Sequence, residues 1–301
     1  MDADASRRLT VDFSEPERLR LSETFMAAEP FAHVVIDNFL SEAGRTALRD
    51  FPAPDWPHWR RFFDEYQKEK RVCADMAYIP GPFADLIHEC SQPGFLGFLE
   101  RLTSVVGLLT DPYLEGGGLH CSGPGGILTP HTDFHYYRKL SLYRILNLLI
   151  YFNDPWEAED GGCLELYQKG ADHPAVCVAP KFGRAVIFKT DDRSVHGFSH
   201  PVAAGRWRNS LALYYYTSRE GRGYAGDTTT HWQTHGALLR GPRLALFEAL
   251  MFASRAFSKL AYFANPNSRV LDQGGDKAAM LPSPHADSAP PPLVGRRRTP
   301  S

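Results

Sequence analysis

The sequence lacks the cysteine pattern of a disulfide-stabilised protein. Its five cysteines are an odd number, lie far apart and include no C-x-x-C pair, which favours reduced thiols over a disulfide framework. The stretch from Met1 to Pro16 also lacks the apolar core of a secretory signal. We therefore expect a cytoplasmic protein.

The chain also lacks an excess of charge of either sign and any long apolar run. Its 33 basic and 35 acidic residues give a formal net charge of −2, so nucleic acid is not an expected partner. A transmembrane helix needs roughly 20 mostly apolar residues in a row, and no segment provides them. What is present is a hydrophobic content of 43%, enough for a substantial core.

The section from about Leu119 to Thr217 is rich in short β-forming runs separated by turns. The runs are Leu142–Phe152, Cys163–Tyr167, Ala185–Lys189 and Ser210–Tyr216, and the turns contain clusters such as Gly123–Gly126 and Asp160–Gly162. Regular strands with such turns indicate an antiparallel sandwich or a closed jelly roll.

The flanking segments indicate helices around this β-rich section. Residues 32–37 predict a strand, Ser41 is the expected N-cap of a following helix, and two helices separated by Gln92–Gly94 are expected between Pro82 and Val106. In the C-terminal part, three charges at spacings of seven and four predict an amphipathic helix at about 242–263. This helix can pack on its own domain, form a homodimer or lie on a membrane surface.

These patterns together predict an α+β fold with a mainly β core, which is a double-stranded β-helix (jelly roll) with supporting N-terminal helices and a C-terminal amphipathic helix. We expect an N-terminal extension at 1–28, one domain at 29–273 with its jelly-roll core at about 115–220, and a disordered tail at 274–301.

Three residues form the principal candidate for a metal site. Side chains alternate along a strand, so His131 and Asp133 project from the same face. His196 follows Asp133 by 63 residues in another strand-like stretch, and a folded-back sheet can bring all three together. Two imidazoles and one carboxylate on one side of an ion leave the opposite positions open, which suits ferrous iron. An iron site that must stay ferrous also indicates a reducing compartment.

Other histidines compete with this set. His120 is either a core residue or part of the same cavity, and His135 continues the alternation of 131 and 133 toward the cavity. His173 lies in a polar loop and His200 precedes a proline, so both are expected outside the site.

A basic residue follows the last proposed ligand. Arg208 and Ser210 share one face of a predicted strand, whereas Arg206 lies nearer the turn and is expected to be solvated. A guanidinium directed into an apolar barrel needs an anionic partner. A dicarboxylate can accept bidentate hydrogen bonds from Arg208 and one more from Ser210.

From about Phe31 to Thr217 the chain resembles the 2-oxoglutarate- and Fe(II)-dependent dioxygenases, and within them the prolyl 4-hydroxylase-like branch. The resemblance rests on the opening Phe31–Leu40, His131-Thr132-Asp133, Leu148–Asn153, Asp160–Tyr167, Ser194-Val195-His196 and Arg208-Asn209-Ser210. Leu119–Ser122 stands where many relatives have a tyrosine.

The resemblance implies that His131, Asp133 and His196 hold Fe(II), and that Arg208 binds the distal carboxylate of 2-oxoglutarate with help from Ser210. Tyr151 corresponds to a tyrosine that hydrogen-bonds this carboxylate in some relatives; the alternative is a plain core residue. The implied activity is hydroxylation of an unactivated C–H by O2 with release of succinate and CO2, since halogenating relatives replace the carboxylate ligand. The resemblance also allows ascorbate as a reductant.

The substrate stays open between a prolyl residue in a peptide and a small metabolite. Residues 54–80 form either part of a substrate-binding wall or core filling, and residues 135–139 are expected at the cavity mouth. Two other functions remain: a non-catalytic jelly-roll module that binds a metal or ligand as a sensor, and a zinc hydrolase that uses three histidines.

Overall fold

The computed structural model describes residues 7–10, 14–219, 230–232, 249, 250, 253 and 257. Its helices are α1 Glu15–Ala27, α2 Glu42–Ala47, α3 Gly81–Glu89, α4 Pro93–Thr103 and the short 3-10 helix η1 Ala158–Asp160. Its strands are β1 His33–Ile36, β2 Arg60–Phe62, β3 Gln67–Cys73, β4 Leu109–Thr110, β5 Gly118–Thr132, β6 Tyr136–Tyr137, β7 Leu142–Tyr151, β8 Leu164–Tyr167, β9 Val176–Val178, β10 Ala185–Lys189, β11 Val195–Phe198, β12 Arg208–Thr217 and β13 His231–Trp232.

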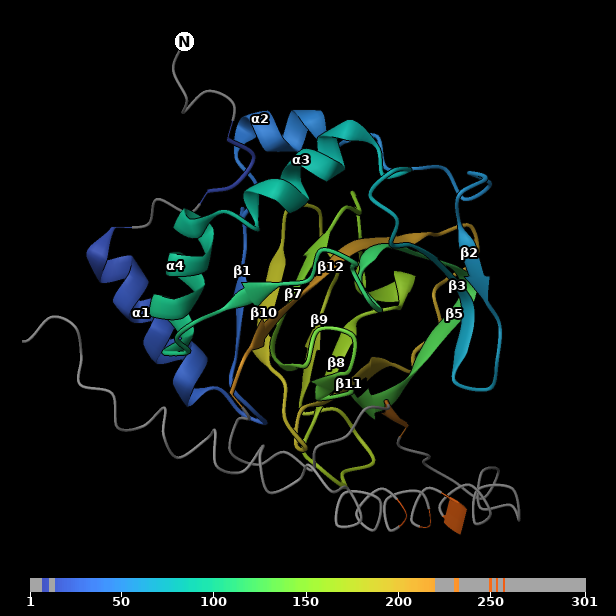
Figure 1. The fold of residues 1–301 in the computed structure, drawn as a ribbon. Helices are drawn as coiled ribbons and strands as arrows, with labels where there is room; N and C mark the ends of the chain where they lie inside the picture. Colours follow the sequence, from blue (N-terminus) through green and yellow to red (C-terminus); the bar gives the residue numbers. More distant parts are fainter. Residues whose placement is uncertain are drawn as a thin grey trace, which may run out of the picture. The chain divides into compact units, whose positions relative to one another are not determined.

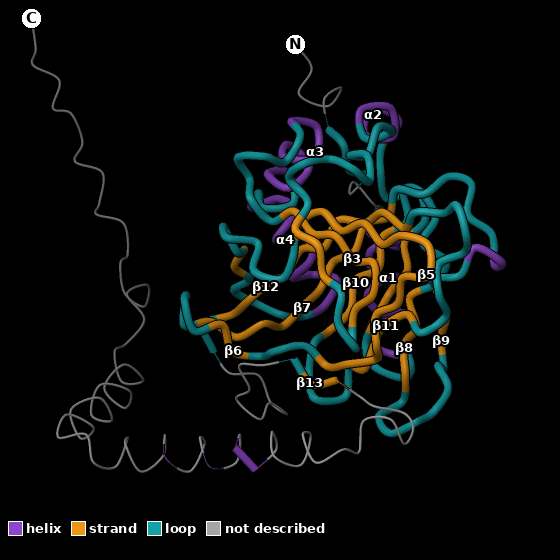
Figure 2. The backbone as a smooth tube through the Cα atoms, turned by 90° about the vertical axis from the view of Figure 1, so that its right-hand side faces the viewer, coloured by secondary structure: helices purple, strands orange, loops and turns teal. Residues whose placement is uncertain are grey.

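The strands form a nearly closed, jelly-roll-like barrel, which confirms the predicted β core. Their order is β1-β10-β7-β12-β5-β11-β8-β9, and the pairs along this path are antiparallel. The long strand β5 joins the two halves, because its first part pairs with β12 and its last part with β11. Figure 2 shows β7 and β12 on one side and β8, β9 and β11 on the other.

Alternation along β7 separates the barrel interior from the helix-covered face. Leu146, Leu148 and Ile150 belong to the main hydrophobic core, which also contains side chains of α3 and α4. Asn147 and Leu149, between them, line the cavity inside the barrel. This period-two pattern is the one expected for a sheet buried on one side by helices and hollowed on the other.

The helices lie on the outside of the sheet, with α1 beside α4 (Figure 1). The predicted N-cap of α2 is present, since the Ser41 hydroxyl accepts a hydrogen bond from the Gly44 backbone N–H over 3.0 Å. The two expected helices, α3 and α4, are present, but the break lies between Glu89 and Pro93, so that Pro93 and Gly94, expected in the break, begin α4.

Helix α1 lies within a segment whose pattern gave no helix prediction. The Glu17 carboxylate accepts hydrogen bonds from the backbone N–H and the hydroxyl of Ser14 over 2.9 and 2.6 Å, which fixes the first turn. The buried ring of Phe25 anchors the helix in the core that it shares with α4.

The expected C-terminal helix at about 242–263 is not confirmed, because most of it lies outside the described residues, and the tail at 274–301 lies wholly outside them. In the part of the chain that is described, no helix combines the length and apolar composition needed to cross a lipid bilayer.

Candidate active site

Strand pairing brings the three predicted metal ligands together. His131 lies near the end of β5 and His196 lies in β11, and the two residues are direct partners in the antiparallel register. Asp133 follows the end of β5 by one residue. The three residues are therefore close in space although the chain separates them.

The donor atoms of these side chains converge on one point. Oδ1 of Asp133 lies 3.6 Å from Nε2 of His131, and Oδ2 lies 3.5 Å from Nε2 of His196. All candidate ligand atoms lie within 4.8 Å of one another, and each residue is only 6% exposed. Among the described residues, this is the group of histidine and acidic side chains arranged to hold a metal ion.

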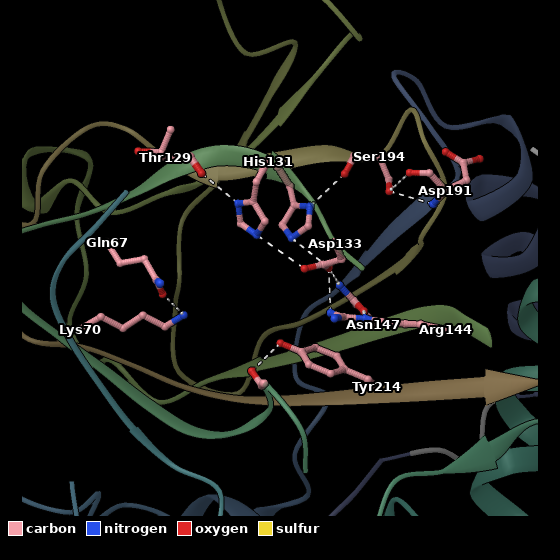
Figure 3. A network of polar contacts seen from close by, with 12 residues as sticks. Gln67, Lys70, Thr129, His131, Asp133, Arg144, Asn147, Asp191, Ser194 and Tyr214 are labelled. Carbon is pink, nitrogen blue, oxygen red and sulfur yellow. Dashed lines mark hydrogen bonds and ion pairs between the residues drawn. The ribbon is translucent and has the colours of Figure 1, made fainter. Parts of the chain in front are cut away.

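Backbone carbonyls fix the orientation of both imidazoles (Figure 3). Nδ1 of His131 lies 2.8 Å from the Thr129 carbonyl oxygen, and Nδ1 of His196 lies 2.9 Å from that of Ser194. A carbonyl can only accept, so Nδ1 of each ring donates. In the neutral imidazole the lone pair is then on Nε2, which faces the Asp133 carboxylate and is free to bind a metal.

The protonation states suit metal binding. Burial lowers the pKa of His196 to about 4, even though the nearby Asp133 carboxylate raises it. Burial raises the pKa of Asp133, but the Arg144 guanidinium, together with the contacts to His196 and His131, outweighs this effect and holds that pKa well below its usual range. At neutral pH the cluster therefore offers a neutral imidazole at His196 and an ionised carboxylate.

The donor set fits ferrous iron. Two imidazole nitrogens and one carboxylate oxygen form the facial triad of non-haem Fe(II) oxygenases, and the opposite side is open for other ligands. Here that side faces a cavity of about 960 Å³ lined by all three residues. A structural zinc site would be closed by a fourth protein ligand, and the described residues provide no such ligand within this group.

Two residues of β7, Arg144 and Asn147, contact the Asp133 carboxylate. Arg144 was not identified as a site residue from the sequence. Nη2 of Arg144 lies 2.7 Å from Oδ2 of Asp133, and Nδ2 of Asn147 donates to the same oxygen over 2.8 Å. Nε of Arg144 in turn donates to Oδ1 of Asn147 over 2.8 Å. Both side chains are 1% exposed, so this is a buried network around a single carboxylate oxygen.

A β-bulge explains why the position of Arg144 could not be predicted. Strict alternation places Arg144 on the face opposite Asn147. In the register, however, Leu146 faces Tyr215 and Arg144 faces Tyr216, so Ile145 is an extra residue in β7. The bulge reverses the alternation and turns the guanidinium into the barrel. The available signal was a charged residue within a predicted strand that is mostly apolar.

Arg208 lies in the same cavity without a carboxylate partner among the described residues. Its Nε donates to the Gly162 carbonyl oxygen over 2.6 Å and Nη2 to the Tyr151 hydroxyl over 3.3 Å. The guanidinium also lies over the Phe198 ring, at 4.5 Å. Arg208 is 6% exposed, and a buried charge held only by neutral groups is a binding site for an anion.

The glycine pair after Asp160 makes room for this arginine. Gly162 has a φ of +59°, and a Cβ there would lie 3.0 Å from Cδ of Arg208. A side chain at this position would be strained and would also displace the arginine. By contrast, Arg206 pairs with Asp160 over 2.7 Å and does not line the cavity.

Ser210 and Tyr151 lie next to each other in the sheet, and their role in cosubstrate binding stays a prediction. They are direct partners in the pairing of β12 with β7, and both are buried. Ser210 lines the cavity, while Tyr151 contacts Arg208 and belongs to a small apolar cluster with Leu164.

The competing histidines fall into different environments. His120 lines the cavity, and burial lowers its pKa to about 3. His135 is buried but pairs with Asp192 over 2.9 Å and does not line the cavity, contrary to the expected alternation. His173 and His200 are exposed, as predicted.

Residues 54–80 are divided between the hydrophobic core and the cavity lining, and their role as a substrate-binding wall stays a prediction. Trp59 is part of the main core, whereas Arg60, Phe62 and Lys70 line the cavity. Of the segment 135–139, Lys139 lines the cavity.

Part of the chain matches the model of a known protein family. Residues 117–216 match the family model described as the 2OG-Fe(II) oxygenase superfamily. No curated protein matches the chain. For residues 117–216, this match confirms the expected resemblance to the 2-oxoglutarate- and Fe(II)-dependent dioxygenases. The matched segment contains all six proposed site residues.

Solved structures with a similar arrangement include three oxygenases. A prolyl hydroxylase from Trichoplax adhaerens, in complex with a hypoxia inducible factor oxygen degradation domain peptide fragment, is 19% identical, with 68% of this chain and 94% of that chain covered and a TM-score of 0.49. A prolyl-4-hydroxylase from Pseudomonas putida is 18% identical, with coverages of 65% and 98% and a TM-score of 0.45. HygX from Streptomyces hygroscopicus, with nickel and 2-oxoglutarate bound, is 15% identical, with coverages of 73% and 97% and a TM-score of 0.45.

Proposed function

We propose that this protein is a 2-oxoglutarate- and O2-dependent hydroxylase that oxidises an unactivated C–H bond and releases succinate and CO2. One observation carries the proposal. The cluster of His131, Asp133 and His196 opens into the same cavity as Arg208, a buried cation without a carboxylate partner among the described residues. A metal and a dicarboxylate thus have adjacent sites.

In this proposal the two imidazole Nε2 atoms and the Asp133 carboxylate hold Fe(II), which supplies dioxygen activation when it is bound. The carbonyls that accept from Nδ1 keep both rings in the ligating tautomer. The contacts of Arg144 and Asn147 to Oδ2 leave Oδ1 as the less encumbered oxygen for the metal.

Arg208 binds the distal carboxylate of 2-oxoglutarate in this proposal. The carboxylate of the cosubstrate supplies the negative charge that the buried guanidinium lacks. A hydrogen bond between two charged groups is strong where water is excluded. The Tyr151 hydroxyl accepts from Arg208 and can donate its own proton to the carboxylate. Ser210 of β12 is the register partner of Tyr151, and its hydroxyl can donate a second hydrogen bond to the carboxylate.

The rest of the cavity orients the substrate and excludes water. Leu149, Leu164 and Phe198 provide apolar wall near the proposed metal ligands, where an aliphatic C–H can approach the metal. We propose a reducing cytoplasmic setting, because ferrous iron and the five cysteines, all free thiols in the structure, fit such a compartment.

The test is anaerobic reconstitution with Fe(II) and 2-oxoglutarate, followed by addition of O2. We expect the visible absorption of a ferrous 2-oxoglutarate complex, and then succinate in an amount that depends on both components. His131→Ala and Asp133→Ala should abolish both signals, and His173→Ala, at an exposed position, should leave them unchanged.

Arg208→Met should weaken 2-oxoglutarate binding by on the order of 100-fold, with Arg206→Met as the matched control outside the cavity. Absence of both the absorption and the succinate would favour a binding or sensor module. Hydrolytic activity that needs no O2 and survives Arg208→Met would favour a zinc hydrolase.

A further inference from the structure

A third basic side chain, Lys70, faces the cavity beside Arg208. Strand β5 lies between β3 and β12, and Ser122 of β5 is the register partner of both Lys70 and Arg208. All three residues line the cavity. They therefore form one row across three neighbouring strands, with the hydroxyl of Ser122 between the two cations.

Lys70 has no ion pair within the described part of the chain. Its Nζ donates over 3.0 Å to Oε1 of Gln67, which is a neutral group (Figure 3). Burial lowers the pKa of Lys70 to about 8, although the Asp133 carboxylate raises it and Arg208 lowers it further. The amine is still mostly protonated at neutral pH, in an environment that does not compensate its charge.

Basic residues outnumber acidic ones in the cavity lining, with Arg60, Lys70, Lys139, Arg144 and Arg208 against Asp75, Glu115 and Asp133. The proposed Fe(II) and 2-oxoglutarate together add no net charge. Arg144 is paired with Asp133 at 2.7 Å. The distal carboxylate of 2-oxoglutarate would compensate Arg208, and the metal would compensate the other carboxylate. Lys70 then remains a cation without an ion pair among the described residues, with the neutral Gln67 as its hydrogen-bond partner. Keeping such a charge half-buried is unfavourable unless a ligand brings the opposite charge.

We propose that Lys70 binds an oxyanion group, a carboxylate or a phosphate, of the hydroxylated substrate, with Ser122 as a second donor. The inference rests on the proposed hydroxylase function and narrows its substrate class to molecules that carry an anionic group. Phe62, Val72 and Leu128 also line this part of the cavity, so the substrate carries an apolar portion next to its anionic group.

The experiment measures binding rather than turnover. The full chain is loaded anaerobically with Fe(II) and saturating 2-oxoglutarate, which occupies Arg208, and is titrated calorimetrically with hexanoate, hexyl phosphate and the uncharged hexanamide. We expect at least one anion to bind about tenfold more tightly than the amide, the gain of a charge-assisted hydrogen bond. The preferred anion identifies a carboxylate or a phosphate substrate.

Three variants test whether Lys70 causes this preference for an anion over the amide. Lys70→Met should remove it, Lys70→Arg should keep most of it, and Lys68→Met, at an exposed position of the same strand that does not line the cavity, should leave it intact. The affinity for 2-oxoglutarate, measured without probe, should stay the same in all three.

Equal binding of the anions and the amide, no binding of either anion, or an unchanged preference in Lys70→Met overturns the inference. So does a large loss of 2-oxoglutarate affinity in Lys70→Met, which would make Lys70 a cosubstrate anchor. Each of these results leaves the ferrous 2-oxoglutarate absorption of the wild type in place, whereas loss of that absorption in the wild type refutes the proposed function itself.

Discussion

Arg144 and Asp133 form an ion pair inside the barrel, with 2.7 Å between Nη2 and Oδ2. The guanidinium is 1% exposed, and the ring of Tyr214 lies 3.3 Å from its central carbon. A positive charge thus lies next to a carboxylate that is also the proposed metal ligand. In the metal-free protein, Arg144 and Asn147 are among the groups that stabilise this buried anion.

Arg144→Met should destabilise the metal-free protein much more than the metal-loaded one. Removing one partner of a buried pair leaves the other charge uncompensated, at a cost of about 3 kcal/mol or more. A bound divalent ion supplies the missing positive charge and should restore most of this loss. Urea unfolding with and without Ni(II) measures both states.

The control is Arg18→Met, which breaks an exposed pair with Glu15 in α1. Exposed pairs contribute at most about 1 kcal/mol, so this variant should change stability little in either state. If Arg144→Met lost the same stability with and without Ni(II), the ion pair would not be coupled to the metal site.

Asn147→Leu should weaken metal binding by about tenfold, because residues that orient a ligand typically contribute this much. The change removes a donor to Oδ2 of Asp133 and the acceptor of Arg144 Nε. Asn153→Leu is the matched control, since Asn153 is also buried but binds the Pro180 carbonyl away from the cluster. It should lower stability and leave the metal affinity, measured by titration, unchanged.

Tyr151→Phe should raise the KM for 2-oxoglutarate by about tenfold with little effect on kcat, because it removes one hydrogen bond to a charged group. Burial raises the pKa of Tyr151, so its hydroxyl is protonated and can donate while it accepts from Arg208. Tyr215→Phe loses a bond to the Cys90 carbonyl in the helix-side core. An equal rise in KM for that variant would show a general packing effect.

The sequence predicted those parts of the site that depend on regular alternation. His131 and Asp133 share a face two residues apart, and the position of Arg208 after His196 placed it in the same barrel. Each of these inferences needs only the period of a strand and the closure of the sheet. The β core between about 115 and 220 followed from the same periodicity.

The parts that could not be predicted depend on local irregularity or on tertiary contacts. The position of Arg144 depends on the bulge at Ile145, which no pattern in the sequence marks. Helix α1 has few apolar residues, and Phe25 is the one that is buried. Its formation depends on packing against α4, so a periodicity search does not find it.

Lys70 also predicts a specific pH dependence. Its pKa is about 8 because burial lowers it, so raising the pH from 7 to 9 should remove its charge and weaken hexanoate binding to the anaerobic Fe(II)–2-oxoglutarate complex. The probe itself does not titrate here, since carboxylates have pKa values of roughly 4.

The neighbouring groups do not account for such a change. The charged groups that influence Lys70 are the carboxylates of Asp133 and Asp64 and the guanidinium groups of Arg208 and Arg144. The pKa of Asp133 lies well below its usual range and that of Arg144 is raised, so these two do not titrate between pH 7 and 9. His120, with a pKa of about 3, is neutral throughout. The loss of binding should therefore follow a single titration.

Lys70→Arg decides the assignment, because a guanidinium stays charged over this range. Hexanoate binding to this variant should be independent of pH from 7 to 9, whereas the wild type should lose about tenfold once the amine is neutral. The affinity for hexanamide should not vary with pH in either protein. A decline of the same size in Lys70→Arg would mean that another group titrates, and would remove Lys70 as the anion-binding residue.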